Sequence, residues 1–350
     1  MNKIKNSIAA VMVLTAVITL TPSCKKSSEK VNFNSDKTKL STEIDSLTAV
    51  YSAAVEGKQA GDYTIGSKAA LNTALTLAAS VKTGSFTQQQ VNNAAANLLR
   101  AGTQFSINLI QQISAANLVA SWTFSGNAND VSGNGNNGTL QTGWVGPYGA
   151  PAVDGATLPV LVADRYGVAN SAYHFTNGAY VEVPYQASLR PSSFTISAWI
   201  KPDLASNGNY IFSVDRWNGY KFQLQGSDLP FLTVNTSTGD HDQDDGGPSV
   251  TLNVWSHVVA SFTNGTEKFY INGVLVKTAN VTGDPVTIPS PPPVAIGNEL
   301  PKSAYNFIDP NSPNAYYGGN YFLGSIDDVH LYNKVLSDAE VKSLYTMEAP

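Results

Sequence analysis

The carboxylates of this sequence are the first candidates for chemistry, because hydrolysis of a glycosidic bond needs two of them facing that bond about 5 to 9.5 Å apart. Between residues 118 and 339, glutamate occurs at Glu182, Glu267 and Glu299, and none of these has an aspartate two residues later. No Gly-x-Ser-x-Gly, His-Glu-x-x-His or phosphate-binding loop appears either. We therefore predict a protein that is not an enzyme. A catalytic pair of carboxylates distant in sequence stays open as an alternative.

Two segments are rich in oxygen ligands. The segment from Asn127 to Asn137 contains Asp130 among asparagines and glycines, which suits a Ca²⁺ ion with its six to eight oxygen ligands. A second segment has Asp240, Asp242 and Asp244 in alternation, but it lacks the glycine and the glutamate that a calcium loop needs at positions six and twelve. We interpret this second segment as a solvated acidic hairpin tip and as a secondary candidate for ligand contact.

Aromatic and amide side chains are concentrated in two other segments. One is the loop from Pro301 to Tyr321, and the other is Asp215 to Tyr220. Aromatic rings stack on the apolar faces of sugars, while amides and carboxylates bind their hydroxyls. The predicted ligand-binding residues are therefore Trp217, Tyr305, Tyr316, Tyr317, Asp240 and Asp242. In the alternative interpretation, the rings cover a sheet edge or the core.

The composition favours β structure and excludes some partners. Charged residues make up 13% of the chain, about half the roughly 25% of typical domains, while 28 Gly, 18 Pro, 16 Tyr and 13 Phe indicate a turn-rich fold. The formal net charge of -5 gives no basic surface for nucleic acid. A single cysteine forms no intramolecular disulfide and no thiolate metal cluster.

That cysteine lies at the end of an export signal. Lysines precede an apolar stretch from Ile8 to Leu20, which is too short to span a membrane, and Thr21-Pro22-Ser23-Cys24 follows. Residues 1–24 resemble a bacterial lipoprotein signal peptide in which Cys24 becomes acylated, and residues 25–35 form a polar tether. The resemblance implies an exported protein of the outer membrane or cell surface that contacts the membrane through its lipid anchor alone. The alternative is an ordinary signal peptide.

Residues 36–116 have helical periodicity. Three apolar stripes run from Leu40 to Val55, from Ile65 to Val81 and from Val91 to Leu109, and Thr87 with Gln90 predicts a capping box before the third. Such stripes predict a small three-helix bundle. Gly61-Asp62-Tyr63 and the alanine-rich seams resemble FIVAR-type modules, which implies a spacer.

Residues 117–350 have the pattern of an antiparallel sandwich. Short apolar or alternating runs are separated by turn residues, and Asn264-Gly265 and Asn272-Gly273 predict two tight hairpins. The predicted strands cover 118–124, 172–175, 180–183, 194–200, 210–214, 220–224, 255–263, 267–271 and 274–278.

Five motifs in this region resemble the LamG-like, concanavalin A-like jelly roll. They lie at 124–139, 194–202, 255–259, 270–273 and 324–337. The resemblance implies a mainly β fold of two antiparallel sheets in which the first and last strands pair, with a short helix at 337–345. It also implies that Asp327 points at the oxygen-rich loop, so that Asn127, Asp130, Asn137 and Asp327 would hold a structural Ca²⁺. The alternative is that these side chains form turns and accept backbone N–H bonds.

We therefore expect a lipid-anchored surface protein that binds an extracellular glycan through its jelly roll. A module for protein adhesion or assembly, or an unrecognised glycoside hydrolase or lyase, are the alternatives.

The lipid anchor is testable directly. Cys24→Ala removes the thiol that would carry the lipid, so incorporation of a radioactive fatty acid should be lost in the variant. Equal labelling of the variant and the parent protein would contradict the anchor.

Overall fold

The computed structural model of this protein describes residues 32–244 and 246–350. The predicted signal peptide, Cys24 and most of the tether lie outside the described residues. Within the part of the chain that is described, no helix is long and apolar enough to cross a membrane.

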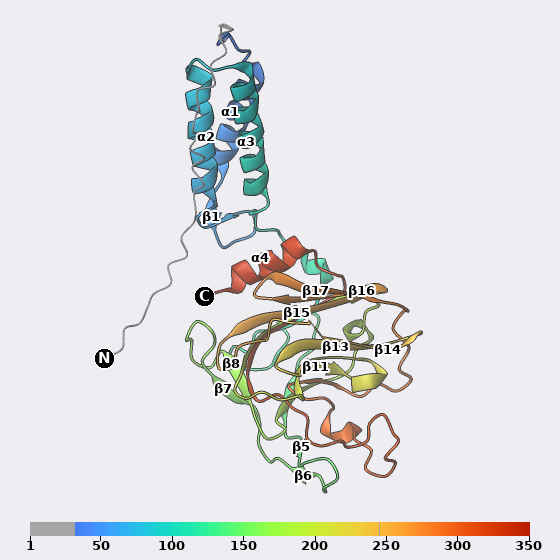
Figure 1. Cartoon of the computed structure of the whole chain (residues 1–350). Coiled ribbons are helices and arrows are strands. Elements are labelled where there is room, and N and C mark those ends of the chain that lie inside the picture. Colours follow the sequence, from blue (N-terminus) through green and yellow to red (C-terminus); the bar gives the residue numbers. More distant parts are fainter. Residues whose placement is uncertain (1–31, 245) are drawn as a thin grey trace, which may run out of the picture.

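Residues 38–106 form an antiparallel bundle, which we call the three-helix module (Figure 1). Its helices are α1 (Thr38–Ala53), α2 (Ser67–Thr83) and α3 (Gln88–Ser106), and the short strands β1 (Glu56–Gly57) and β2 (Tyr63–Thr64) pair between α1 and α2. The predicted capping box is present at α3, where Thr87 and Gln90 exchange hydrogen bonds. The apolar stripes meet in one core of Leu40, Ile44, Leu71, Leu75, Val91, Leu98 and Phe105. Val55, Ile65 and Leu109 lie beyond the helix ends and are exposed.

Residues 118–350 form a two-sheet antiparallel sandwich, which we call the β-domain. The first sheet has the order β17-β16-β15-β10-β19-β8-β7, with β3 also paired to β19, and the second has the order β14-β13-β12-β11-β18-β9-β4. The first comprises β3 (Leu118–Trp122), β7 (Val160–Val162), β8 (Ala172–Phe175), β10 (Phe194–Pro202), β15 (Ser256–Thr263), β16 (Gly265–Ile271), β17 (Val274–Val281) and β19 (Gly324–Tyr332). The second comprises β4 (Thr139–Gln141), β9 (Tyr180–Val183), β11 (Asn209–Val214), β12 (Tyr220–Gln225), β13 (Leu229–Thr236), β14 (Gly239–Asp244) and β18 (Val294–Ile296).

The first and last strands close the sandwich as predicted. β19 lies between β10 and β8, and it pairs antiparallel with β3 through Val329 opposite Trp122 and Leu331 opposite Ala120. Alternate residues of both sheets point inward into one continuous core, in which Trp122 and many phenylalanines are fully buried. The predicted fold class is therefore confirmed.

The acidic segment differs from its interpretation as a hairpin tip. Residues 239–244 form the edge strand β14, where Asp240 pairs with Asn235 and Asp242 pairs with Thr233 of β13. Alternating polar residues give no apolar pattern, so the strand signal was missed. The sequence analysis also missed β13, which contains Pro230, and β18, which is three residues long.

The C-terminal helix joins the two parts of the molecule. Helix α4 (Asp338–Glu348) begins at the predicted cap Ser337, ends three residues later than expected, and lies between the three-helix module and the first sheet (Figure 1). Its apolar side packs on that sheet. Its polar side contacts the linker that follows the module, where Ser343 accepts a hydrogen bond from the Gln111 N–H at 2.8 Å and Lys342 donates to Asn108 at 3.3 Å.

Glu267 of β16 is a carboxyl group enclosed in the sandwich. Its side chain is fully buried, and neither of its oxygens has a hydrogen-bond partner among the described residues. Burial raises the pKa of Glu267 to about 9, the Asp242 carboxylate adds to the rise, and Lys277 opposes it. The folded protein therefore keeps this group protonated and neutral at pH 7.

This burial predicts a pH dependence of stability. Between the ordinary pKa of 4.5 and the raised value, the folded state binds a proton that the unfolded state releases, so stability falls as the pH rises through that window. Glu267→Gln removes this titration. From pH 5 to pH 8, we expect the parent protein to lose roughly a few kcal/mol more unfolding free energy than the variant. Urea denaturation at both pH values measures the difference, and parallel pH dependences would contradict the prediction.

Candidate functional site

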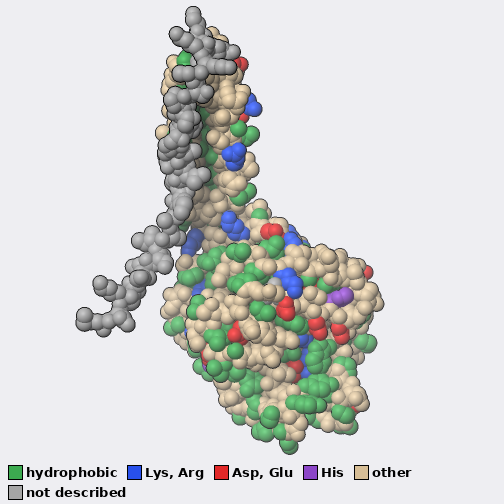
Figure 2. All heavy atoms as spheres, in the orientation of Figure 1, with side chains coloured by type: hydrophobic (Ala, Val, Ile, Leu, Met, Phe, Trp, Pro, Cys, Tyr) green, Lys and Arg blue, Asp and Glu red, His purple; other side chains and the backbone are tan. Residues whose placement is uncertain are grey.

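Aromatic side chains gather at the end of the β-domain that is farthest from the three-helix module. The strands β5 (Trp144–Val145) and β6 (Val153–Asp154) pair at this end (Figure 1). Apolar side chains are concentrated over the same end (Figure 2). Three segments meet here, 142–155, 215–219 and 301–321, which we call the distal loops. They carry Tyr148 and Ile308, which are 72% and 95% exposed. Contiguous exposed apolar patches are typical of interaction surfaces, so this end of the β-domain is a candidate site.

Three rings form a row across the distal loops, which we call the ring row. The centroids of Trp217 and Tyr317 lie 5.5 Å apart in an edge-to-face arrangement, and those of Tyr317 and Tyr148 lie 5.9 Å apart. A second ring cluster lies beside the row, with neighbouring centroids 5.4 to 6.1 Å apart, and it consists of Trp144, Tyr305, Phe307 and Tyr316. The distal loops therefore present half-buried rings from separate parts of the chain on one surface.

Two hollows lie in this surface. The first, which we call the ring-lined hollow, has a volume of about 500 Å³ and lies between the segments 148–152 and 306–316, with Tyr148, Phe307 and Tyr316 in its wall. The second, which we call the amide-lined hollow, has a volume of about 390 Å³ and contains Asp215, Asn218, Asn235 and Asn314 together with the segment 286–290. Concave sites with apolar walls and a few convergent polar groups are typical of small-ligand binding.

A buried ion pair lies beneath the ring row. Nη1 of Arg216 is 3.0 Å from Oε2 of Glu299, and both side chains are fully buried. The guanidinium carbon lies 4.2 Å from the ring centre of Trp217 and 5.4 Å from that of Tyr317, which places a cation under both rings. Burial raises the pKa of the Glu299 carboxyl, and Arg216 opposes that rise.

The same two residues hold the loop from Pro301 to Tyr321. Arg216 donates through Nη2 to the Ala315 carbonyl at 3.0 Å and also to the Pro313 carbonyl. Oε1 of Glu299 accepts a hydrogen bond from the Tyr305 hydroxyl at 3.0 Å. The loop is therefore fixed by charge-assisted hydrogen bonds.

The backbone at the amide-lined hollow is strained. Asp215 and Arg216 have φ angles of +55° and +45°, in the left-handed region that non-glycine residues rarely adopt. Strain of this kind persists where the surroundings impose it, often at functional sites. Burial raises the pKa of Asp215, although hydrogen bonds from Asn314 and Asn218 oppose the rise.

The structure brings four of the six predicted ligand residues together. Trp217, Tyr316 and Tyr317 are half-buried rings of the distal loops, and Tyr305 adds part of its ring while its hydroxyl is bound to Glu299. Asp240 and Asp242 lie on the edge strand β14 and line neither hollow.

The predicted calcium ligands have protein partners. Asp130 accepts backbone hydrogen bonds from Ser121, Ser132 and Asn136 at 2.8 to 3.0 Å. Burial acts to raise the pKa of Asp130, but these hydrogen bonds outweigh it and hold the pKa below its usual value. The side-chain oxygens of Asn127 and Asn137 also accept backbone N–H bonds, from residues 129 and 130.

Asp327 is held by a cation of the protein. Its Oδ2 is 2.5 Å from Nη1 of Arg165, and Arg165 also pairs with Asp328 at 2.6 Å. The Arg165 guanidinium would compete with a cation for Asp327, and three backbone N–H groups occupy acceptor sites of Asp130. Calcium binding by the loop itself stays a prediction.

Among the described residues, one further group of side chains could hold a metal ion. One ligand atom each of Asp328, His330 and Glu348 lies within 4.8 Å of the others. These atoms are already engaged, because His330 pairs with Glu348 at 3.0 Å and Arg165 pairs with Asp328. We therefore interpret the group as an ion-pair network that holds the end of α4.

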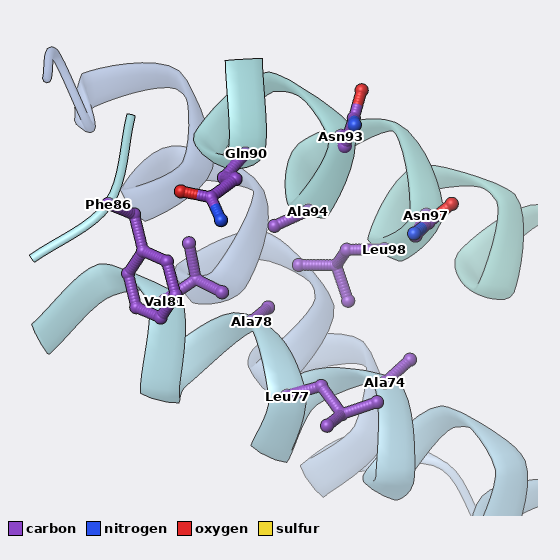
Figure 3. A pocket seen from close by; sticks show the side chains of 10 residues that line it. All are labelled: Ala74, Leu77, Ala78, Val81, Phe86, Gln90, Asn93, Ala94, Asn97 and Leu98. Carbon is purple, nitrogen blue, oxygen red and sulfur yellow. The ribbon is translucent and has the colours of Figure 1, made fainter. Parts of the chain in front are cut away.

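The three-helix module has a groove of a different character. It lies between α2 and α3, and Figure 3 shows Ala94 and Leu98 of α3 facing Leu77 and Ala78 of α2. Its volume is about 330 Å³, and its walls are mainly apolar. Its described lining contains one aromatic ring, Phe86, and the amides of Gln90, Asn93 and Asn97, but no row of rings and no carboxylate.

Comparison with known families concerns the β-domain. Residues 175–342 match the family model of the concanavalin A-like lectin/glucanases superfamily. The matched range includes β11 and β18, the strands that Arg216 and Glu299 follow, and β3 precedes it. No curated protein matches the sequence.

The structure also matches solved structures at low identity. Domain 4 of AbnA, a GH43 extracellular arabinanase from Geobacillus stearothermophilus in complex with arabinotriose, is 20% identical, with 65% of this chain and 98% of that chain covered and a TM-score of 0.48. The binding domain of Paraclostridial Mosquitocidal Protein 1 is 20% identical, with 66% and 52% covered and a TM-score of 0.44. The receptor binding domain of botulinum neurotoxin mosaic serotype C/D is 17% identical, with 67% and 51% covered and a TM-score of 0.45. This chain spans about half the length of the last two.

Sequence reasoning missed the residues that support the site. Arg216 was seen as part of an aromatic segment and Glu299 as an isolated glutamate, and Tyr148 was not singled out. The signal for Arg216 and Glu299 was present, because each is a charged residue within three positions of the end of an apolar strand. Their pairing was not visible, because 83 positions separate them and the sheet order brings them together.

The calcium prediction has a thermal test. An ion that binds the folded state alone stabilises it by mass action, by about 2.7 kcal/mol at a hundredfold excess over the dissociation constant. If the loop from Asn127 to Asn137 binds Ca²⁺, the melting temperature should be higher in millimolar CaCl₂ than in EDTA, and Asp130→Asn should abolish the difference. Coinciding scans of the parent protein would rule out calcium at this loop.

Proposed function

We propose that this protein is an exported, lipid-anchored surface protein that binds an extracellular glycan through its β-domain without catalysing a reaction. The observation that carries the proposal is the arrangement of the distal loops, where half-buried rings and amides from separate segments surround two hollows. Rings that stack on sugar faces and amides that bind hydroxyls are the groups a glycan site requires.

The carboxylates of the distal loops support binding rather than hydrolysis. Hydrolysis needs two carboxylates that both reach the substrate. The amide-lined hollow contains one carboxyl group, Asp215, and the ring-lined hollow contains none. Glu299 is nearby but fully buried, and it is paired with Arg216. A hydrolase would therefore need a second carboxylate from outside both hollows.

The proposed export and anchoring rest on residues 1–24 and support the same function. A surface position gives access to extracellular glycans. The three-helix module would separate the anchor from the distal loops, which lie at the opposite end of the β-domain (Figure 1).

Protein adhesion is the second candidate function, and a different surface favours it. The groove between α2 and α3 is apolar, and the adjacent Leu77 is 64% exposed. Adhesion through this groove would be insensitive to changes in the distal loops.

Substitutions in the distal loops separate these functions. Trp217→Ala, and Tyr316→Ala combined with Tyr317→Ala, should each lower affinity for an immobilised glycan about tenfold or more, because each removes apolar ring area that a sugar would bury at roughly 25 cal/mol per Å². A glycan array with the chain lacking residues 1–24, with and without Ca²⁺, identifies the ligand, and titration calorimetry then measures the affinities.

The control is Trp255→Ala, which removes a half-buried tryptophan that contacts Lys201 outside the distal loops. It should leave glycan affinity unchanged. The rings are half-buried, so the distal-loop variants should lose roughly 1 kcal/mol of stability. A large fall in melting temperature would show that the rings are core residues, and unchanged affinity at unchanged stability would exclude the distal loops as the binding site.

A further inference from the structure

The two hollows of the distal loops share a border at residues 314–316. Asn314 lines the amide-lined hollow, while Ala315 and Tyr316, its successors in sequence, line the ring-lined hollow. The ring row also connects the two hollows. Trp217, at one end of the row, lies in sequence between Asp215 and Asn218 of the amide-lined hollow. Tyr148, at the other end, lines the ring-lined hollow. A ligand that fills one hollow can therefore continue across the rings into the other.

The amide-lined hollow offers oriented hydrogen-bond acceptors. Asn218 donates through Nδ2 to Oδ1 of Asn314 at 3.3 Å, and Asn235 donates through Nδ2 to the Trp217 carbonyl at 2.9 Å. These bonds fix both amide planes. No described residue donates a hydrogen bond to the Oδ1 atoms of Asn218 and Asn235, so both oxygens are available to ligand hydroxyls.

The charges around the hollows disfavour an acidic ligand. Neither hollow has a lysine or arginine among its described lining residues. The two cations that lie over rings of the distal loops are already paired, Arg216 with Glu299 at 3.0 Å and Lys302 with Asp154 at 2.5 Å. Carboxylate and sulfate groups are normally bound by free arginine or lysine. Asp215 would moreover repel an anion in the amide-lined hollow.

We propose that the two hollows and the ring row form one elongated site for an internal stretch of a neutral, chain-like polysaccharide. One sugar is fixed in the amide-lined hollow through its hydroxyls, and the following sugars lie on the ring row toward Tyr148. This inference rests on the proposed function, because it specifies the class of glycan that the distal loops bind.

Chain length is the first measurement. The probes are neutral polysaccharides (a β-glucan, a xylan, an arabinan and a mannan) and acidic ones (polygalacturonate, alginate and heparin), followed by fragments of two, four and six sugar units from the neutral polysaccharide that binds best. Each added sugar covers further ring area, so the affinity should rise about tenfold from two to six units. Raising the salt concentration should change the affinity less than twofold, because no ion pair forms.

Two variants locate the ends of the site. Tyr148→Ala removes a ring that is 72% exposed, so folding should be retained, and it should reduce affinity for six units by about fivefold more than for two units. Asn218→Ala removes an acceptor of the amide-lined hollow, so it should weaken all fragments by a similar factor and preserve their ratio. Thermal scans of both variants measure whether they fold as the parent protein does.

The possible failures are distinguishable. Equal affinity for two and six units would overturn the elongated site, and so would an equal loss for both lengths in Tyr148→Ala. Tighter, salt-dependent binding of an acidic polysaccharide would overturn the neutral class but retain glycan binding. If no polysaccharide binds the parent protein, the proposed function itself fails.

Discussion

The buried ion pair between Arg216 and Glu299 is the interaction on which the distal end of the molecule depends. Arg216 follows β11 and Glu299 follows β18, and these strands are hydrogen-bonded neighbours in the second sheet. The sheet therefore fixes the pair, and the pair fixes the carbonyls of Pro313 and Ala315 and the hydroxyl of Tyr305. A loop of about twenty residues with little regular structure of its own is held in one conformation in this way, and its rings occupy defined positions.

The buried ion pair and the left-handed backbone beside it lower the stability of the folded protein. Burial of two charges is unfavourable even when they meet, and the left-handed backbone at Asp215 and Arg216 adds about 1 to 3 kcal/mol for each residue. The continuous core between the sheets offsets these costs. In return, the rings and amides are oriented before a ligand arrives, so less conformational entropy is lost on binding.

The sequence predicted what depends on local patterns. Alternation identified nine strands, Asn272-Gly273 marked a hairpin in which both residues have positive φ, and the caps at Thr87 and Ser337 were evident from their spacing. The aromatic content of the distal loops was also visible. Contacts between residues distant in sequence were not visible. Asp327 pairs with Arg165, which is 162 positions away, and the sequence around Arg165 does not indicate which carboxylate it contacts. β14 was missed for a different reason, because an edge strand of polar residues has no apolar alternation.

The position of α4 has a mechanical consequence. The carbonyl of Glu348 accepts hydrogen bonds from Arg165 and Tyr166 of the β-domain, and the carbonyl of Ala349 accepts one from Lys58 of the three-helix module. If a force pulled the distal loops away from the N-terminal end of the module, two connections would bear it. They are the linker of residues 107–117 and the side-chain hydrogen bonds at the end of α4. The contact made by Lys58 is single and exposed, so it yields at lower force than the ladder between β3 and β19. The module would then swing as a lever about the linker while the sandwich stays closed.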